Sequence, residues 1–241
     1  KATTALAQRL GKTAVEAADT PGFIVNRVAR PFYLEALRIL GAGGADAPTI
    51  DAALRGAGFR MGPFELIDTI GLDVNLAVSE SVWEGFGRAP RYLPHALQQV
   101  LVQAGRLGRK TNAGFYDYGA DGQRGAAWSE LAAAAEAPNA TPLSEAAITD
   151  RVMAAIVNEA ASAVEDQTAR PDAIDTAMRL GTNWPRGPLA WGEERGLAQA
   201  VAILDALAAD APDARYAVVP LLRDLAERDE SFFTGTPPDP R

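Results

Sequence analysis

The hydrophobic residues of this chain recur at helical spacing over most of its length, and alternating, strand-like runs are few. This pattern predicts a mainly helical protein. The clearest helix begins after Asp19 or Thr20, either of which can cap it, with Pro21 at the first helical position. Its apolar positions continue until Gly41 ends it. Pro31 is expected to kink this helix, because proline removes one backbone hydrogen bond and clashes with the preceding turn.

The remaining segments comprise five more expected helices and two short stretches that lack helical spacing. Further helices are expected at about residues 2–10, 48–56, 63–70, 74–86 and 94–104. The run Thr13-Ala-Val-Glu-Ala17 predicts a short strand, whose backbone donors and acceptors need a partner. That partner is either a hairpin from elsewhere in the chain or a sheet outside it. The aromatic segment Gly114-Phe-Tyr-Asp-Tyr118 predicts a short strand or a packed loop.

The helical pattern occurs twice along the chain, with counterparts 124 or 125 residues apart. The matching pairs are Asn26-Arg27 and Asp150-Arg151, Glu35 and Glu159, Ile50-Asp51 and Ile174-Asp175, Gly62-Pro63 and Gly187-Pro188, Gly71-Leu72 and Gly196-Leu197, and Arg91-Tyr92 and Arg215-Tyr216. Such self-similarity predicts two copies of one helical unit. We expect residues 19–118 and 144–229 to form the copies, residues 119–143 to link them, and residues 230–241 to be a tail.

Composition narrows the classes of function. The net charge is −8 and the charged residues are scattered, which favours a soluble acidic surface and argues against a nucleic-acid partner. No apolar run reaches the ~20 residues of a membrane-spanning helix and no signal segment opens the chain, so we expect a cytoplasmic protein without a membrane partner. The chain has no cysteine and one histidine, which excludes thiolate nucleophiles and multi-histidine metal centres. We therefore expect no metal cofactor.

One stretch is specific enough to indicate a family. Asp19-Thr-Pro-Gly-Phe-Ile-Val-Asn-Arg27 resembles the segment that opens the C-terminal domain of 3-hydroxyacyl-CoA dehydrogenases. Met61-Gly-Pro-Phe-Glu-Leu-Ile-Asp68 and the segment from Gly105 to Tyr118 add to this resemblance, in the order and spacing of that family. Asn112 departs from the family's glycine, but asparagine tolerates a left-handed turn. The second copy resembles the degenerate repeat of longer bacterial members.

The resemblance implies a fold. That fold is all-α, with two tandem helical repeats like the C-terminal domain of 6-phosphogluconate dehydrogenase. Residues 1–18 would then be a remnant helix and strand from the end of a Rossmann-type domain that binds NAD.

The resemblance also implies an activity, the NAD-dependent oxidation of 3-hydroxyacyl-CoA to 3-oxoacyl-CoA in fatty-acid, phenylacetate or other aromatic-acid breakdown. The acyl-CoA substrate and NAD belong to the intact enzyme. In the family, NAD and the catalytic histidine and glutamate lie in the N-terminal domain, so we expect this chain alone to be inactive. The alternative is a stand-alone helical module for dimerisation or interaction, without catalysis.

Asn26 is the residue expected to take part in catalysis. It matches the family asparagine that orients the catalytic histidine and the substrate oxygen, a role that needs an uncharged donor and acceptor. The alternative is an ordinary asparagine on a helix surface or in helix packing. In the second copy Asp150 stands at the matching position, and no counterpart of the segment from Lys110 to Tyr118 follows it. That copy is not expected to be a second active site.

Five further residues are weaker candidates for substrate binding, namely Met61, Gly62, Pro63, Phe64 and Lys110. The first four form a bend that in the family faces the acyl-pantetheine cleft, and a tight helix–helix corner is the alternative. Lys110, with Arg106 and Arg109, is a candidate for attracting CoA phosphates. Basic residues after a helix end more often complete the helix dipole, and this is the alternative there.

Three other conspicuous side chains have structural interpretations. Glu35 and Glu159 are each expected to pair with an arginine or to cap a neighbouring helix, and not to act as paired catalytic carboxylates. The candidate arginines are Arg27 and Arg151, each two turns away in sequence. His95 begins a short helix with no nearby glutamate, which favours a surface or interface histidine.

The second repeat is expected to have a structural role. Trp184 and Trp191 should fill its core. In single-copy family members the helical domains pair as a two-fold dimer, so we expect the second repeat to pack on the first as an internal version of that dimer. The whole chain is a further candidate for homodimer formation.

Overall fold

The computed structural model describes residues 2–131, 141–211 and 213–233. Helices dominate these ranges, and their sheet content is one two-stranded hairpin. The mainly helical structure predicted from the hydrophobic spacing, and the all-α fold implied by the resemblance, are therefore confirmed. None of the described helices is both long enough and apolar enough to cross a membrane.

The first repeat consists of short helices followed by the hairpin. Its α-helices are α2 (Val25–Val28), α3 (Arg30–Gly41), α4 (Ala47–Gly56), α5 (Pro63–Ile70), α6 (Leu72–Gly85) and α7 (Ala96–Gln103). Its 3-10 helices are η1 (Pro90–Tyr92), η2 (Arg109–Thr111) and η3 (Ser129–Leu131). The hairpin pairs β1 (Tyr116–Tyr118) with β2 (Arg124–Ala127) in antiparallel orientation.

The second repeat reproduces the helices in the same order and has no counterpart of the hairpin among its described residues. It contains α8 (Glu145–Glu165), α9 (Pro171–Thr182), α10 (Pro188–Arg195), α11 (Leu197–Ala209) and α12 (Pro220–Arg228). The sequence offset makes α8 the counterpart of α2 and α3 together, and makes α9 to α12 the counterparts of α4 to α7.

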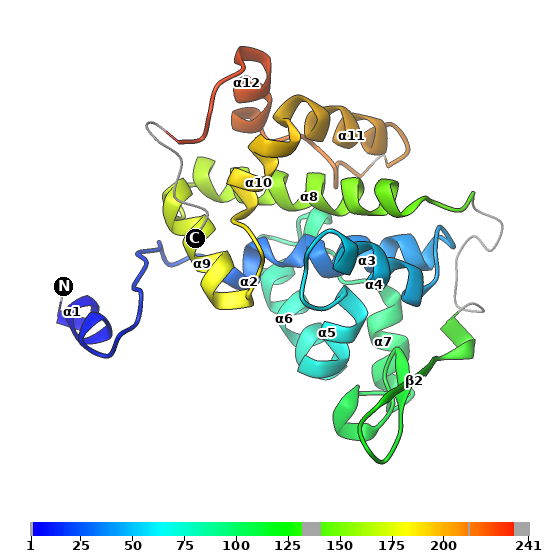
Figure 1. The fold of residues 1–241 in the computed structure, drawn as a ribbon. Coiled ribbons are helices and arrows are strands. Elements are labelled where there is room, and N and C mark those ends of the chain that lie inside the picture. Colours follow the sequence, from blue (N-terminus) through cyan, green and yellow to red (C-terminus); the bar gives the residue numbers. More distant parts are fainter. Residues whose placement is uncertain (1, 132–140, 212, 234–241) are drawn as a thin grey trace.

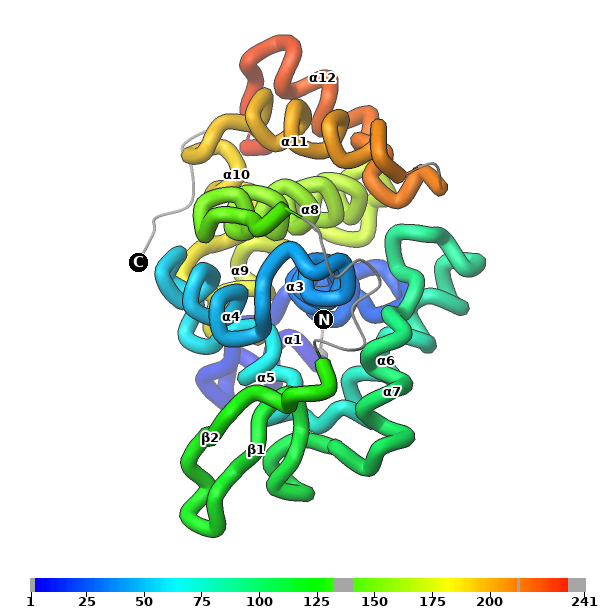
Figure 2. The backbone as a smooth tube through the Cα atoms, turned by 90° about the vertical axis from the view of Figure 1, so that its right-hand side faces the viewer, coloured from blue at the N-terminus to red at the C-terminus, as the bar shows by residue number. Residues whose placement is uncertain are grey.

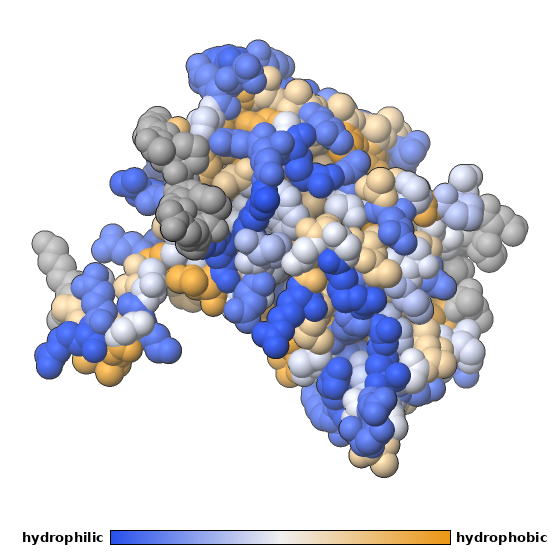
Figure 3. Space-filling model, viewed as in Figure 1, coloured by the Kyte–Doolittle hydropathy of each residue, from blue (hydrophilic) through white to orange (hydrophobic). Residues whose placement is uncertain are grey.

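The N-terminal segment stands apart from the two repeats. α1 (Ala2–Arg9) confirms the first predicted helix, and it projects from the body of the molecule (Figures 1 and 3). The predicted strand at Thr13–Ala17 is wrong, because this segment runs without helix or strand. Beyond it, Ala18 N donates to Thr168 O at 2.7 Å. A strand needs a neighbouring strand to pair its backbone groups, and the described residues supply none here.

Pro31 breaks the long helix that was predicted to run from Pro21 to Gly41. The chain makes a turn, forms α2, and restarts as α3 at Arg30, with Ala29 between the two helices. Pro31 lies in the first turn of α3, where a missing N–H leaves no intrahelical bond unmade. The counterpart α8 is one continuous helix of 21 residues and has Ala155 at the matching position.

The two repeats pack directly on each other. α8 lies against α3 and α4 of the first repeat, and α9 lies against α2. Figures 1 and 2 both show α8, α11 and α12 of the second repeat above the first repeat, whereas α9, in yellow, reaches down to the level of α3. The buried apolar residues of both repeats form one continuous core. The expected packing of repeat on repeat within one chain is therefore observed.

Aromatic side chains fill the interface between the repeats. Trp184 and Trp191 both contact Phe59 of the first repeat, with ring centroids 5.3 and 5.2 Å apart. Trp184 also contacts Phe32, at 5.9 Å. The prediction that these tryptophans fill the core of the second repeat was too narrow, because large rings bury most area where two elements of different repeats meet.

The predicted linker and tail lie only partly within the described ranges. Residues 119–131 of the expected linker include β2 and η3, so this part belongs to the hairpin region of the first repeat. Residues 132–140 of that linker, and residues 234–241 of the expected tail, lie outside the described residues.

Candidate functional site

Asn26 lies exposed on α2. Its side-chain amide forms no hydrogen bond with a described residue, whereas its backbone carbonyl accepts one from Arg30 Nε at 2.9 Å. Phe23, also exposed, precedes it with a left-handed φ of 48°. α6 contacts α2 and presents the exposed side chain of Val74. The amide is thus accessible to a ligand, and apolar side chains are exposed in the turn before α2 and on α6.

Arg30 follows Asn26 by one helical turn and is buried, with 4% of its surface exposed. Besides the bond to the Asn26 carbonyl, its Nη1 donates to Ser79 Oγ at 3.1 Å. The guanidinium stacks over the ring of Tyr33, with Cζ 4.8 Å from the centroid. No carboxylate among the described residues forms an ion pair with it. Burial lowers the pKa of Arg30. Sequence reasoning missed this residue.

Uncharged polar side chains of α6 and α7 adjoin Arg30. Gln98 Nε2 donates to Asn75 Oδ1 at 2.8 Å and to Ser79 Oγ at 3.2 Å. Ser79 Oγ in turn donates to the Asn75 carbonyl at 2.9 Å. Asn75 Nδ2 is buried and has no acceptor among the described residues. These four residues form a buried polar cluster, which we call the Arg30 cluster.

His95 lies next to this cluster, because its backbone bonds to Gln98. Its Nδ1 accepts a hydrogen bond from Leu97 N at 3.3 Å, and its backbone N donates to Gln98 Oε1 at 3.0 Å. The imidazole also packs so closely against Gly41 that a Cβ there would lie 2.6 Å from His95 Cε1. His95 therefore caps α7 and packs against the end of α3.

The bend from Met61 to Phe64 forms the corner between α4 and α5. Asp51 Oδ1 accepts from Phe64 N at 2.9 Å and therefore caps α5 from outside the helix. A Cβ at Gly62 would lie 2.3 Å from Asp51 Oδ1, so only glycine fits there. Gly62, Pro63 and Phe64 are buried, whereas Met61 is half-buried. This is the geometry of the corner that was the alternative to a substrate contact.

The same carboxyl ties the corner to the hairpin. Asp51 Oδ2 accepts from Tyr116 OH at 2.7 Å. Burial raises the pKa of Asp51 to about 7. Asp68 holds the hairpin in a similar way, because its carboxyl accepts from Phe115 N at 2.9 Å and from Tyr118 OH at 3.0 Å. The aromatic segment 114–118 is therefore anchored by two buried carboxyls.

Lys110 is half-exposed and forms an ion pair. Its Nζ lies 2.6 Å from Asp73 Oδ2, in the first turn of α6. Asn112 adopts the left-handed conformation expected of it, with a φ of 54°. The structure therefore places Lys110 at the start of α6. Asn26, on α2, and Arg30, at the start of α3, lie beside the same helix.

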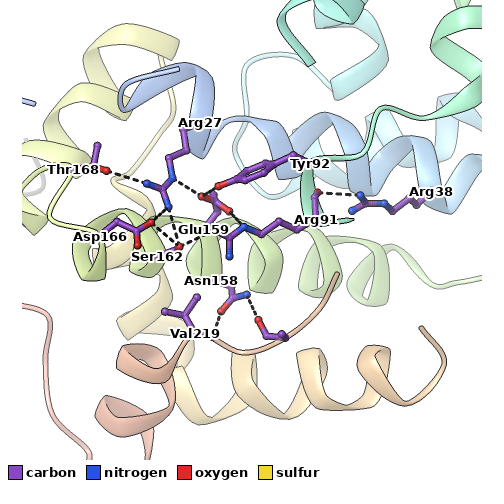
Figure 4. Close-up of polar contacts among 11 residues, drawn as sticks. Arg27, Arg38, Arg91, Tyr92, Asn158, Glu159, Ser162, Asp166, Thr168 and Val219 are labelled. Atoms are coloured by element: carbon purple, nitrogen blue, oxygen red, sulfur yellow. Dashed lines mark hydrogen bonds and ion pairs between the residues drawn. The ribbon is translucent and has the colours of Figure 1, made fainter. Parts of the chain in front are cut away.

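The two buried glutamates pair with arginines across the repeats, and Figure 4 shows the pair at Glu159. Glu159 Oε1 lies 2.7 Å from Arg27 Nε and accepts from Tyr92 OH at 2.5 Å. In the reverse sense, Glu35 Oε2 lies 2.9 Å from Arg151 Nε and accepts from Tyr216 OH at 3.0 Å.

These pairs confirm that each glutamate binds an arginine, but the expected partner, the arginine two turns earlier in the same copy, is wrong. The pairs are crossed, because each arginine contacts the glutamate of the other repeat. Arg38 and Arg91 also join, one with each glutamate. Arg27 is further bound by Ser162, Thr168 and Asp166. The glutamates are thus held by ion pairs in the interface between the repeats.

Metal binding finds no support in this geometry, since the described residues contain no group of three or more histidine, aspartate or glutamate side chains placed to hold an ion.

The model of the 3-hydroxyacyl-CoA dehydrogenase C-terminal domain family matches the chain twice, at residues 22–118 and 148–231. The chain belongs to this family. The two matches coincide with the two helical repeats, so the family's C-terminal domain is present here in tandem.

Relatives within this family resemble the chain over nearly all of its length. The 3-hydroxyadipyl-CoA dehydrogenase of Escherichia coli K12 is 36% identical and matches 90% of this chain and 61% of its own. The fatty acid oxidation complex subunit alpha of Acinetobacter baylyi is 34% identical, over 96% of this chain and 33% of its own. The crystal structure of 3-hydroxybutyryl-CoA dehydrogenase from E. coli K12 superposes with a TM-score of 0.80 at 34% identity, over 93% of this chain and 63% of that one. The chain thus spans less than two thirds of each of these relatives.

Proposed function

We propose that this chain is the substrate-side and assembly region of an NAD-dependent dehydrogenase that oxidises 3-hydroxyacyl-CoA to 3-oxoacyl-CoA. The observation that carries the proposal is Asn26, which is exposed, has no side-chain partner among the described residues, and belongs to the family segment 19–27. An exposed amide offers one donor and one acceptor, which suit a substrate oxygen and a neighbouring imidazole.

The residues of this chain do not fit NAD itself. A dinucleotide site needs a glycine-rich turn between a parallel strand and a helix, and the strands in the described part form one antiparallel hairpin. The family's histidine base has no counterpart either, because the one histidine of the chain caps α7. We therefore infer that the chain works joined to a domain that holds NAD and the base, and that it is inactive alone.

Asn26 acts through hydrogen bonding in this proposal. Negative charge develops on the C3 oxygen as its proton leaves, and the amide N–H of Asn26 stabilises that charge while the amide oxygen orients the base. Asp150, at the matching position of the second repeat, would repel such an oxygen. It pairs instead with Arg195. The second repeat therefore contributes packing and not a second active site.

The substrate class is a finer proposal that rests on the names of the relatives. Among these, one acts on 3-hydroxyadipyl-CoA, a dicarboxylic acyl-CoA, and another on 3-hydroxybutyryl-CoA. We infer a short or dicarboxylic acyl group in fatty-acid or aromatic-acid breakdown. Lys110 remains a proposed contact for a CoA phosphate, and the corner from Met61 to Phe64 a proposed wall of the pantetheine path.

A fusion protein tests the proposal. The chain is joined behind the N-terminal part of the E. coli 3-hydroxyadipyl-CoA dehydrogenase that it does not match, and NAD reduction is followed with 3-hydroxybutyryl-CoA and 3-hydroxyadipyl-CoA. We expect turnover by the fusion and none by the 241-residue chain alone. Asn26→Ala should lower kcat of the fusion by about 100- to 1,000-fold, the usual effect of losing one oxyanion donor.

The duplication provides the matched control. Asp150→Ala removes the side chain at the same place in the second repeat and should leave turnover unchanged. Wild-type turnover by Asn26→Ala, or equal losses in the two variants, would remove Asn26 from the mechanism. NAD reduction by the chain alone would contradict the inferred division of labour.

A further inference from the structure

Arg30 is a buried cation without an anionic partner among the described residues. The other deeply buried arginine of the same helix pair, Arg27, is bound to two carboxylates, of Glu159 and Asp166. Arg30 has instead a carbonyl, a hydroxyl and an aromatic ring. An uncompensated charge in a protein interior is costly, and folding alone gives no reason to keep one.

The Arg30 cluster also contains more donors than acceptors. Ser79 Oγ already accepts from Arg30 Nη1 and from Gln98 Nε2. Asn75 Oδ1 accepts from Gln98 Nε2. Two donors remain, because Asn75 Nδ2 has no acceptor and Arg30 Nη2 donates to no described residue. A group that accepts two hydrogen bonds and carries a negative charge would satisfy both, and a carboxylate does this with its two oxygens.

The second repeat shows that the helical fold does not require this cluster. The sequence offset pairs each polar member, and Tyr33 beneath the guanidinium, with an apolar residue of the second repeat. The replacements are Ala154 for Arg30, Val157 for Tyr33, Ala200 for Asn75, Leu204 for Ser79 and Leu222 for Gln98. At these matching positions the same helices pack without a charged side chain. The cluster is therefore specific to the repeat that keeps Asn26.

We propose that Arg30, with Asn75 beside it, binds the carboxylate at the far end of a dicarboxylic acyl chain and so selects such substrates. This rests on the proposed function, in which Asn26 holds the C3 oxygen. Arg30 Nε lies 2.9 Å from the Asn26 carbonyl oxygen, so the two residues are neighbours across the break between α2 and α3. The three bonds from C3 to C6 of a six-carbon acyl chain span roughly 4 Å at about 1.5 Å each, so one acyl group is short enough for its two oxygen-bearing ends to meet neighbouring residues.

Binding of two unreactive acyl-CoAs to the fusion protein tests this inference without any turnover. Adipyl-CoA and hexanoyl-CoA have six acyl carbons each and differ in ending with a carboxylate or a methyl group. Isothermal titration calorimetry should show tighter binding of adipyl-CoA. Arg30→Met should weaken adipyl-CoA about 10- to 100-fold, the usual effect of losing a charge-assisted hydrogen bond, and leave hexanoyl-CoA unchanged or bound more tightly. Arg30→Lys should recover part of the preference.

Two controls separate selectivity from folding. Arg223→Met removes a half-exposed arginine of the second repeat and should leave both affinities unchanged. A thermal melt of each variant reports folding, and the ratio of the two affinities is insensitive to a uniform loss of folded protein.

Equal affinities for the two acyl-CoAs in the wild-type fusion, equal losses in Arg30→Met, or no binding of either one would overturn the inference. A fusion that prefers adipyl-CoA but does not reduce NAD would support the role of Arg30 and contradict the proposed function. A fusion that reduces NAD but binds adipyl-CoA and hexanoyl-CoA equally would support the proposed function and contradict the role of Arg30.

Discussion

Gly62 and Gly187 have the same task at equivalent residues of the two repeats. A Cβ at these positions would lie 2.3 Å from Asp51 Oδ1 and 2.1 Å from Asp175 Cγ, respectively. Each aspartate uses this space to accept two backbone N–H groups at the start of the following helix. The repeated glycine and aspartate could be recognised in the sequence, but the contact between them, across an intervening turn, could not.

These two aspartates give the first prediction, a decrease of stability with rising pH. Burial raises the pKa of Asp51 to about 7 and that of Asp175 to about 6. Both values lie above the ordinary pKa of about 3.9, so the folded protein holds protons that the unfolded chain releases. Their contribution to stability is complete below about pH 4 and is lost as the pH rises to about 7.

Urea unfolding at about pH 5 and about pH 7.5 measures whether the free energy of unfolding falls as the pH rises. Asp51→Asn removes the titration, and the variant should lose less stability between the two pH values than the wild type. A steeper loss in the variant would contradict the assignment. Asp175→Asn should act in the same direction with a smaller effect, because its pKa is raised less.

Arg30 shows what residue-by-residue reading of the sequence could not reach. An arginine at the start of an amphipathic helix is normally a surface residue, and its burial becomes visible only when α6 and α7 are packed against it. A signal was nevertheless present in the sequence, because the repeat pairs Arg30 with Ala154 at an internal position. Comparison of the two copies for lost charges would have selected it.

At the scale of elements, the main difference between the repeats is one broken helix. α2 and α3 are separated at Ala29, whereas α8 is continuous. The break was predictable from Pro31, because proline acts locally. The strand predicted at Thr13–Ala17 was not correct, because a strand depends on a partner that the sequence pattern does not identify. Helix positions were accessible from local spacing, and strand pairing was not.

The matched positions Pro31 and Ala155 allow a test of this difference. Ala155→Pro would remove a backbone hydrogen bond and create a clash in the interior of α8, so it should lower the free energy of unfolding by about 3 kcal/mol or more. Pro31→Ala should change it by much less, since Pro31 lies in the first turn of α3. Denaturant titration of both variants measures the difference, and similar losses would show that the position within the helix is irrelevant.

The two repeats of this single chain pack on each other as the two subunits of a two-fold dimer do. Arg27 contacts Glu159 while Arg151 contacts Glu35, so each repeat offers the other the same pair of groups. This reciprocity is the signature of an isologous interface. The repetition and the residue types were readable from the sequence. The crossing of the pairs was not, because a sequence offset does not say whether an arginine meets the glutamate of its own copy or of the other.

A double-mutant cycle on Arg27 and Glu159 tests this interface. Arg27→Met alone should cost about 3–5 kcal/mol, because it removes a buried partner of a buried carboxylate. The double variant Arg27→Met with Glu159→Gln should lose less free energy of unfolding than the sum of the losses in the two single variants. The difference, which is the coupling energy, should be about 1–3 kcal/mol. The half-exposed pair Arg223 and Asp205 provides the comparison, where coupling should stay below about 1 kcal/mol. Additive losses at Arg27 and Glu159 would contradict a direct pair.

The crossed pairing has a consequence for synthesis on the ribosome. Arg27 and Glu159 are separated by 132 residues. At about 5–20 residues per second, the arginine leaves the exit tunnel roughly 7–26 s before its glutamate. During that interval the Arg27 guanidinium of the nascent first repeat stays hydrated at a surface that is later buried. The rings of Phe32 and Phe59 in the same repeat also lack their contacts with the two tryptophans of the second repeat. The interface of the first repeat is therefore completed only after the second repeat has been synthesised, and it is in this interval that a chaperone would have most to protect.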